Sequence, residues 1–210
     1  DDTCSIVESF SKKYTKERVM LLRSPEAGRS YQQNFGALAA NGELLLFVHA
    51  DTHLPTDYDL TIKKELENEE TTVVAFALGL RTNDPAILPI QYTANFRSRY
   101  FGLPYGDQGL AMKQSLFLTL DGFPHQKLME DFEFVRLAAK RGNVKTLQGI
   151  HAMSDDRRYA FNGPIKNTLL NQVFVIAYTY FGYDADTIYH WYYQSALYKT
   201  WFKQPKKKTE

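Results

Sequence analysis

The stretch "LLLFVHADTHLP", Leu44 to Pro55, decides the fold of this chain. It opens with an unbroken apolar run and ends in two histidines that flank Asp51. A short apolar run bounded by turn residues predicts a strand buried on both faces of a parallel sheet, and Pro55 prevents that strand from continuing. Ligands of open α/β sheets bind at the carboxyl ends of the strands, so we expect Asp51 at a ligand site.

The residue types around Asp51 suggest which ligand the site takes. Carboxylate oxygen and imidazole nitrogen suit Mg²⁺ or Mn²⁺ that is bound jointly with a phosphate. A simpler interpretation fits the same residues: Asp51 caps the helix that follows, and His49 and His53 are structural. The residues alone leave both interpretations open.

Helical and strand patterns alternate on both sides of this stretch. They predict an α/β fold, with a mostly parallel sheet flanked by helices, for a domain that spans residues 1–160. The predicted helices cover residues 3–14, 30–41, 56–70 and 128–141, and the predicted strands cover residues 18–22, 44–48, 72–80 and 143–150.

The chain changes character after residue 160. Residues 161–210 predict a helical, aromatic C-terminal extension with a basic tail. The two predicted helices, 165–181 and 185–201, would pack on the domain or on a second subunit as a homodimer. Alternatively, their aromatic side chains rest on a membrane while the lysines attract anionic lipid. No run approaches the roughly 20 apolar residues that a membrane-spanning helix needs.

Composition excludes several classes of function. Of the 210 residues, 44% are hydrophobic and 23% are charged, which is ordinary for a globular protein. The formal net charge of +1 provides no global field for nucleic acid, so we expect no nucleic-acid partner. Cys4 is the single cysteine, which excludes an internal disulfide and favours a reducing, cytoplasmic location.

An acid pair, Glu130 and Asp131, opens the predicted helix at 128–141. The positive end of a helix dipole keeps an acid there ionised, as a catalytic base requires. Acids are also common in the first turn of any helix, so this pair alone is a weak signal. Its value depends on what lies nearby in the fold.

Two further segments are candidates for ligand contacts. "GLPYGDQG", Gly102 to Gly109, places Asp107 and Gln108 between glycines, which let a backbone approach a ligand closely. Arg157 and Arg158 are adjacent arginines, which suit a diphosphate. The simpler alternatives are a surface turn for the first segment and a solvated pair for the second.

Five motifs then follow one another in a recognisable order. They are "GRSYQQNFG" at residues 28–36, "LLFVHADTHLP" at 45–55, "YGDQG" at 105–109, "DGFPHQKLMED" at 121–131 and "RRY" at 157–159. This order resembles the family 2 glycosyltransferases with the GT-A fold, which is Rossmann-like, and is closest to a bacterial-type subgroup. The resemblance runs from about Gly28 to the end of the chain.

The resemblance implies a hexosyltransferase-like enzyme that moves a sugar from a nucleotide diphosphate sugar to an acceptor hydroxyl, usually with inversion. Asp51 would hold Mg²⁺ or Mn²⁺ against the donor diphosphate, and Asp131, beside Glu130, would be the general base. The residues implied in donor binding are Arg29, Asn34, Asp107, Gln108, Arg157 and Arg158. A lipid-linked acceptor would fit a cytoplasmic enzyme that is peripheral at the membrane.

The sequence departs from the family pattern in places. Asp155 and Asp156 precede the arginines where small or hydroxyl residues are usual, and Asp121 replaces the first glycine of GGFP. The family's N-terminal strand is missing before "DDT", about thirty residues or one βαβ unit, so we expect an excerpt of a longer protein. Two other functions compete: a nucleotidyltransferase-like enzyme, and a catalytically silent glycosyltransferase-like binding module.

Overall fold

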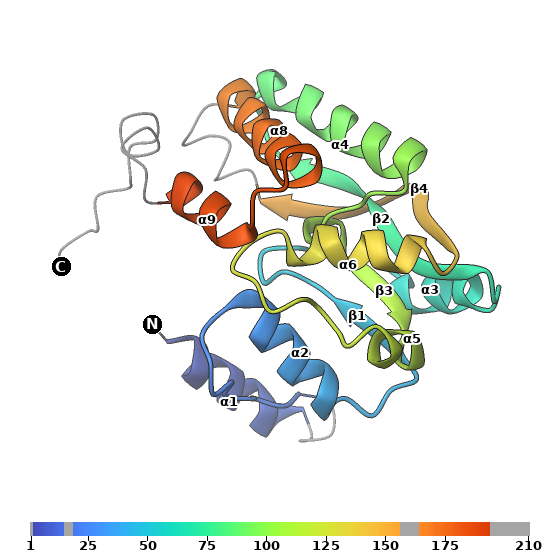
Figure 1. Cartoon of the computed structure of the whole chain (residues 1–210). Helices are drawn as coiled ribbons and strands as arrows, with labels where there is room; N and C mark the ends of the chain where they lie inside the picture. Colours follow the sequence, from blue (N-terminus) through green and yellow to red (C-terminus); the bar gives the residue numbers. More distant parts are fainter. Residues whose placement is uncertain (1, 15–18, 156–163, 194–210) are drawn as a thin grey trace.

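A four-stranded sheet forms the centre of the protein, whose computed structural model describes residues 2–14, 19–155 and 164–193 (Figure 1). The strand order is β1-β3-β2-β4, and the strands are β1 Leu44–Phe47, β2 Thr71–Arg81, β3 Leu110–Lys113 and β4 Asn143–Asp155. Three strands run in the same direction, while β3 lies antiparallel between β1 and β2. The predicted α/β fold with a mostly parallel sheet is therefore confirmed.

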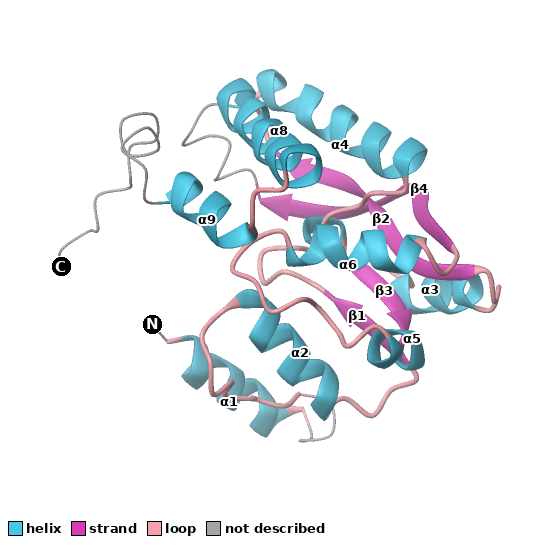
Figure 2. Cartoon of the chain, viewed as in Figure 1, coloured by secondary structure: helices cyan, strands magenta, loops and turns pink. Residues whose placement is uncertain are grey.

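Helices flank this sheet (Figure 2). They are α1 Thr3–Lys13, α2 Arg29–Ala39, α3 Tyr58–Leu66, α4 Leu88–Phe101, α5 Gln114–Thr119, α6 Glu130–Ala139, α8 Pro164–Phe181 and α9 Ala185–Tyr193, with the 3-10 turns η1 Pro85–Ile87 and η2 Gly106–Gln108. One apolar cluster joins α2, α5 and α6 to one face of the sheet, and a second joins α3 to the other.

Strand β2 is the centre of both apolar clusters. All of its residues are buried except the last, Arg81. Val73 and Ala75 belong to the cluster under α6, whereas Val74 and Phe76 belong to the cluster under α3. Successive side chains of a strand point to opposite faces, so one continuous apolar run supplies both layers of the core.

Several sequence expectations need correction. Strand β1 lies at an edge of the described sheet, and its side chains pack against both apolar clusters as expected, but only Leu45 is fully buried. Residues 19–22 form no strand, and residue 18 lies outside the described part. The pattern gave no sign of β3 or α5. Strand β4 continues to Asp155 through a bulge, with Gly149 at a positive φ of 76°.

Helix α4 protects part of a β2 edge that no strand covers within the described residues. Strand β3 pairs with β2 only at Val74 and Ala75. Further along β2, Asn95 of α4 replaces a strand. Its Nδ2 donates to the carbonyl of Leu78 (2.9 Å), and its Oδ1 accepts from the Leu78 N–H (2.7 Å). The amide group of Asn95 thus supplies both hydrogen bonds that a neighbouring strand would make to Leu78.

Side-chain amides also bond to the backbone of β2 two residues before and two residues after Leu78. The Oε1 of Gln91 accepts from the Leu80 N–H at 2.9 Å, and the Nε2 of Gln108 donates to the carbonyl of Phe76 at 2.9 Å. These amides satisfy backbone groups of β2 without adding a strand. They let β2 continue to its last residue, Arg81.

The C-terminal helices pack through a small cluster of Phe174, Ile188 and Tyr192. No helix in the described ranges is long and apolar enough to cross a membrane. The predicted helix at 185–201 is described only as far as Tyr193. The division into residues 1–160 and 161–210 falls within a segment outside the described residues and stays a prediction.

Replacing Asn95 tests how much its hydrogen bonds to the edge of β2 contribute to stability. Asn95→Ala leaves the N–H and the carbonyl of Leu78 without partners, so we expect the free energy of unfolding to fall by about 2–6 kcal/mol, since each of the two orphaned buried groups costs about 1–3 kcal/mol. Urea denaturation measures this. Asn83→Ala, at an exposed position, is the control and should change stability by less than about 0.5 kcal/mol. Equal stability of the two variants would show that the hydrogen bonds of Asn95 to Leu78 do not stabilise the fold.

Candidate functional site

The carboxyl ends of β1, β2 and β4 meet at one open cleft of about 820 Å³. Its lining residues are Arg29, Gln32, Gln33, Val48, His49, Ala50, Asp51, His53, Arg81 and Asp155. The backbone of His53 exchanges two 2.8 Å hydrogen bonds with that of Met153, which holds the segment after β1 against the end of β4. The cleft therefore lies where a Rossmann-like sheet binds its ligands.

Asp51 lies on the wall of this cleft, as the sequence predicted for a ligand-site residue. It is not a helix cap: α3 begins at Tyr58, and its N-cap is Asp57. Among the described residues, no hydrogen bond or ion pair engages the carboxylate of Asp51. This acid is thus available to a ligand in the cleft.

The donor set fits a divalent cation that arrives with a diphosphate. Within the described ranges, no three His, Cys, Asp or Glu side chains gather into a preformed metal cage. Mg²⁺ seldom uses such a cage, because it keeps waters and is bound through one or two carboxylates plus the phosphates of a substrate. Asp51, on the cleft wall, would provide that one carboxylate.

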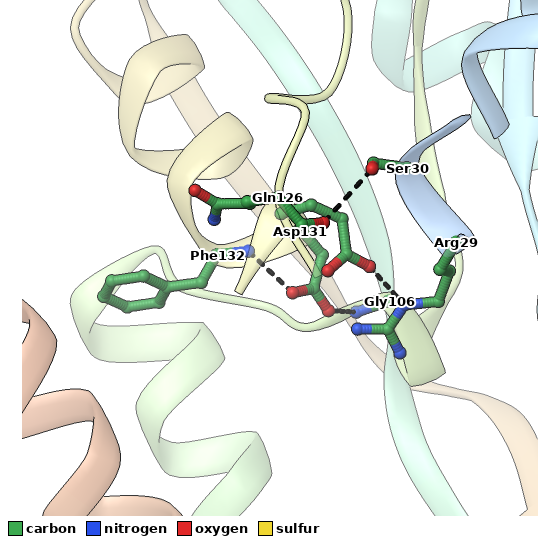
Figure 3. A network of polar contacts seen from close by, with 7 residues as sticks. Arg29, Ser30, Gly106, Gln126, Asp131 and Phe132 are labelled. Carbon is green, nitrogen blue, oxygen red and sulfur yellow. Dashed lines mark hydrogen bonds and ion pairs between the residues drawn. The ribbon is translucent and has the colours of Figure 1, made fainter. Parts of the chain in front are cut away.

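The acid pair at the start of α6 lies next to the cleft and is joined to it through the cleft residue Arg29. Asp131 accepts hydrogen bonds from the N–H groups of Gly106 and Phe132, both at 2.8 Å (Figure 3). The side chain of Glu130 is 1% exposed and accepts a hydrogen bond from the Nε of Arg29, which itself lines the cleft. Arg29 therefore connects the acid pair to the ligand site.

The electrostatics of this pair are asymmetric. Burial raises the pKa of Glu130, the neighbouring Asp131 raises it further, and Arg29 opposes both effects. Burial works against the charge of Arg29, but the hydrogen bond to Glu130 and the charges of both acids outweigh it and raise the pKa of Arg29. A guanidinium is charged at any physiological pH. The charge of Glu130 therefore depends on Arg29.

Gly106 marks the place where the cleft wall meets the acid pair. A methyl group at this position would lie 2.8 Å from the Nε2 of His49 and 3.1 Å from the Oδ2 of Asp131. Only the absence of a side chain lets the two groups approach so closely. The segment that carries Asp51 and the acid Asp131 thus converge on one point.

Two predicted donor-binding residues hold the fold together. The buried Gln108 bonds through its Nε2 to Phe76 and Ser98, and through its Oε1 to Arg97 and the N–H of Tyr105. Its amide group is thus engaged within the fold, and the predicted donor contact of Gln108 stays a prediction.

Asn34 likewise exchanges two hydrogen bonds with the backbone of Phe123, at 2.8 and 2.9 Å. Asp107 is half-buried beside Gln108 in η2. Arg157 and Arg158 lie outside the described residues.

Sequence reasoning missed the cleft residues Arg81 and Asp155. They face each other across the parallel register of β2 and β4, with Arg81 Nη2 at 3.8 Å from Asp155 Oδ2. An arginine that ends a ten-residue buried run is a signal that could have identified the first of them. Asp155 gave no such sign, because β4 was predicted to end before it.

The Arg29–Glu130 pair leads to an asymmetric stability prediction. Arg29→Gln leaves the Glu130 carboxylate buried without its cation and should cost about 1–3 kcal/mol near pH 7. Glu130→Gln should cost less than about 1 kcal/mol, because the half-exposed Arg29 can be hydrated.

The cost of Arg29→Gln should also depend on pH. The pKa of Glu130 is raised on folding, so its ionisation opposes folding as the pH rises above the unfolded value of about 4.3. The cost should therefore vanish near about pH 4. Urea titrations at both pH values measure it, and equal costs for the two variants at each pH would contradict the asymmetry.

Comparison with known proteins places this site in a family. The family model "Glycosyl transferase family 2" matches residues 1–129, which include Asp51 and end just before the acid pair. The structure of the mannosyltransferase PcManGT from Pyrobaculum calidifontis, in complex with GDP-Man and Mn²⁺, is similar with a TM-score of 0.59 and 18% identity.

That similarity covers 81% of this chain and 47% of the mannosyltransferase chain, so the present chain spans about half the length of that relative. No curated protein matches the chain. The family model covers well over half of the chain, and this protein therefore belongs to glycosyl transferase family 2.

Proposed function

We propose that the chain transfers a sugar from a nucleotide diphosphate sugar to an acceptor hydroxyl, with inversion and with a divalent cation. The observation that carries this proposal is the convergence on Gly106: His49, from the segment that carries Asp51, and Asp131 meet there. A metal-binding acid and a base must lie near one another for such a reaction: Asp51 lines the cleft, and Asp131 lies next to it, bonded to Gly106 beside the cleft residue His49. Family membership and the GT-A-like fold agree with it.

Asp51 holds the donor side of the reaction. Its carboxylate on the cleft wall, together with the donor's own diphosphate, provides oxygen ligands for Mg²⁺ or Mn²⁺. Such an ion, when bound, neutralises the charge that develops on a departing diphosphate. Arg29 adds a fixed cation on the same wall, anchored from behind by Glu130.

Asp131 acts on the acceptor. The N–H groups of Gly106 and Phe132 hold its carboxylate in place at the amino end of α6. It takes the proton of the acceptor hydroxyl as the oxygen attacks the anomeric carbon opposite the departing diphosphate. Glu130 is engaged with Arg29, so we place it as the positioning residue of Arg29 and Asp131 as the base.

Two variants should fail at different steps. Asp131→Asn should lower turnover by about 10²–10⁴-fold, the usual contribution of a general base, with donor affinity unchanged within about twofold. Asp51→Asn should instead weaken Mn²⁺-dependent binding of the donor by about tenfold or more. The assay follows nucleoside diphosphate release from a panel including GDP-mannose and UDP-glucose, and calorimetry measures donor binding with and without Mn²⁺.

The controls separate this function from its rivals. Asp59→Asn, at an exposed position of α3, should behave as wild type. Release of pyrophosphate in place of nucleoside diphosphate would indicate a nucleotidyltransferase. Wild-type protein that gives no heat with any donor and Mn²⁺ would indicate a silent binding module. Wild-type turnover in Asp131→Asn would refute the base assignment.

We also propose that the acceptor is lipid-linked and that the protein is a cytoplasmic one that contacts the membrane surface peripherally, without spanning the bilayer. Helices α4 and α8 lie side by side (Figure 1), and neither contains an acidic residue. Exposed aromatic side chains line both helices, namely Tyr92, Phe96, Tyr100 and Phe101 on α4, and Tyr180 and Phe181 on α8. Aromatic residues favour the headgroup level of a bilayer, and lysines near the C-terminus attract anionic lipid.

Vesicle flotation tests this contact. Wild-type protein should float with vesicles of phosphatidylcholine and phosphatidylglycerol, and the double variant Tyr180→Ser/Phe181→Ser should bind at least about tenfold less, since full burial of one ring contributes about 1.5–3 kcal/mol and about 1.4 kcal/mol corresponds to a tenfold change. Tyr58→Ser, on α3, is the control. Absence of wild-type flotation would refute the contact, and a dimer seen by light scattering that the double variant abolishes would assign these aromatic residues to a homodimer.

A further inference from the structure

Arg81 occupies a distinctive place in the cleft. The ten residues that precede it in β2 are buried, and Arg81 is the first to reach solvent, with 44% of its side chain exposed. The strand thus delivers one guanidinium to the cleft wall. A buried strand fixes the backbone of its last residue tightly, so the core sets the point from which this side chain extends.

The partner of Arg81 holds it only loosely. Its Nη2 lies 3.8 Å from the Oδ2 of Asp155, beyond hydrogen-bond distance. An exposed ion pair of this kind contributes about 0–1 kcal/mol. A stronger anion can therefore engage Arg81 at little cost.

Arg29 provides a second cation on the same cleft. Its side chain is 41% exposed, and its Nε is engaged by Glu130. Among the described residues, no hydrogen bond engages its two terminal nitrogens. Guanidinium groups bind phosphate oxygens through paired N–H donors, which makes arginine the preferred residue for diphosphates.

We propose that Arg81 and Arg29 form a two-arginine clamp for the diphosphate of the donor, and that Arg81 is a binding residue of the site. The identity of the anion rests on the proposed function. Two phosphates offer several oxygens, so both arginines and the ion held at Asp51 can engage one diphosphate together. The clamp supplies fixed positive charge where the leaving group accumulates negative charge.

Calorimetry with inorganic pyrophosphate in EDTA tests the clamp without metal, nucleotide or turnover. Wild-type protein should bind pyrophosphate, and Arg81→Gln should weaken the affinity by about tenfold or more, as for the loss of one charge-assisted contact. Arg141→Gln, at an exposed position after α6, is the matched control and should change the affinity by less than about twofold.

A second variant separates anion binding from a merely structural role. If Arg81 served only to hold Asp155, then Asp155→Asn and Arg81→Gln would have similar effects. The clamp predicts opposite signs, because Asp155→Asn removes a negative charge from the cleft and should tighten pyrophosphate binding. Thermal unfolding of each variant reports folding independently.

The outcomes also distinguish the clamp from the proposed function. Wild-type affinity in Arg81→Gln, or no pyrophosphate binding by the wild type, would overturn the clamp even if sugar transfer occurs. Loss of pyrophosphate binding in Arg81→Gln, with opposite signs for the two variants, would establish the clamp even if no nucleotide sugar is turned over.

Discussion

The burial of β2 is the constraint on which the rest of the structure depends. A strand that is buried on both faces needs apolar partners above and below, and α3 and α6 supply them. It also needs hydrogen-bond partners along both edges. Strand β4 pairs with one edge. On the other edge, β3 pairs with only part of β2, and amide side chains bond to backbone groups that β3 does not reach. Once these requirements are met, the end of β2 is fixed in the cleft.

The cleft wall carries two positive charges, Arg29 and Arg81, and the negative charge of Asp51. Each arginine on its wall has an acidic partner: Glu130 behind Arg29, and Asp155 beside Arg81. Asp51 has no such partner among the described residues. The arrangement suits a ligand that carries both signs of charge, as a diphosphate with its divalent cation does. Charges fixed before the ligand arrives need no reorganisation during the reaction.

Close approach at Gly106 links the two halves of the proposed site. One half, from His49 to Asp51, follows a strand, and the other, Asp131, opens a helix. A side chain at residue 106 would displace the His49 imidazole, because its Cβ would lie 2.8 Å from the Nε2 of His49. The same residue donates its N–H to Asp131. Gly106 is therefore in close contact with both halves of the proposed site.

The sequence by itself determined the alternation of strands and helices, the end of β1 as a ligand edge, and the acids Asp51 and Asp131 as candidates. Apolar periodicity and turn residues are local properties, so they can be read along the chain. Residues such as Gln108 and Asn34 were predicted at the ligand, but the fold uses their amides for backbone groups.

The tertiary structure alone decided which strand ends are neighbours. The order β1-β3-β2-β4 and the bulge in β4 bring Arg81 and Asp155 to the cleft that Asp51 lines. No local pattern encodes that order, because it arises from pairing between residues far apart in the chain and from the packing of both faces at once.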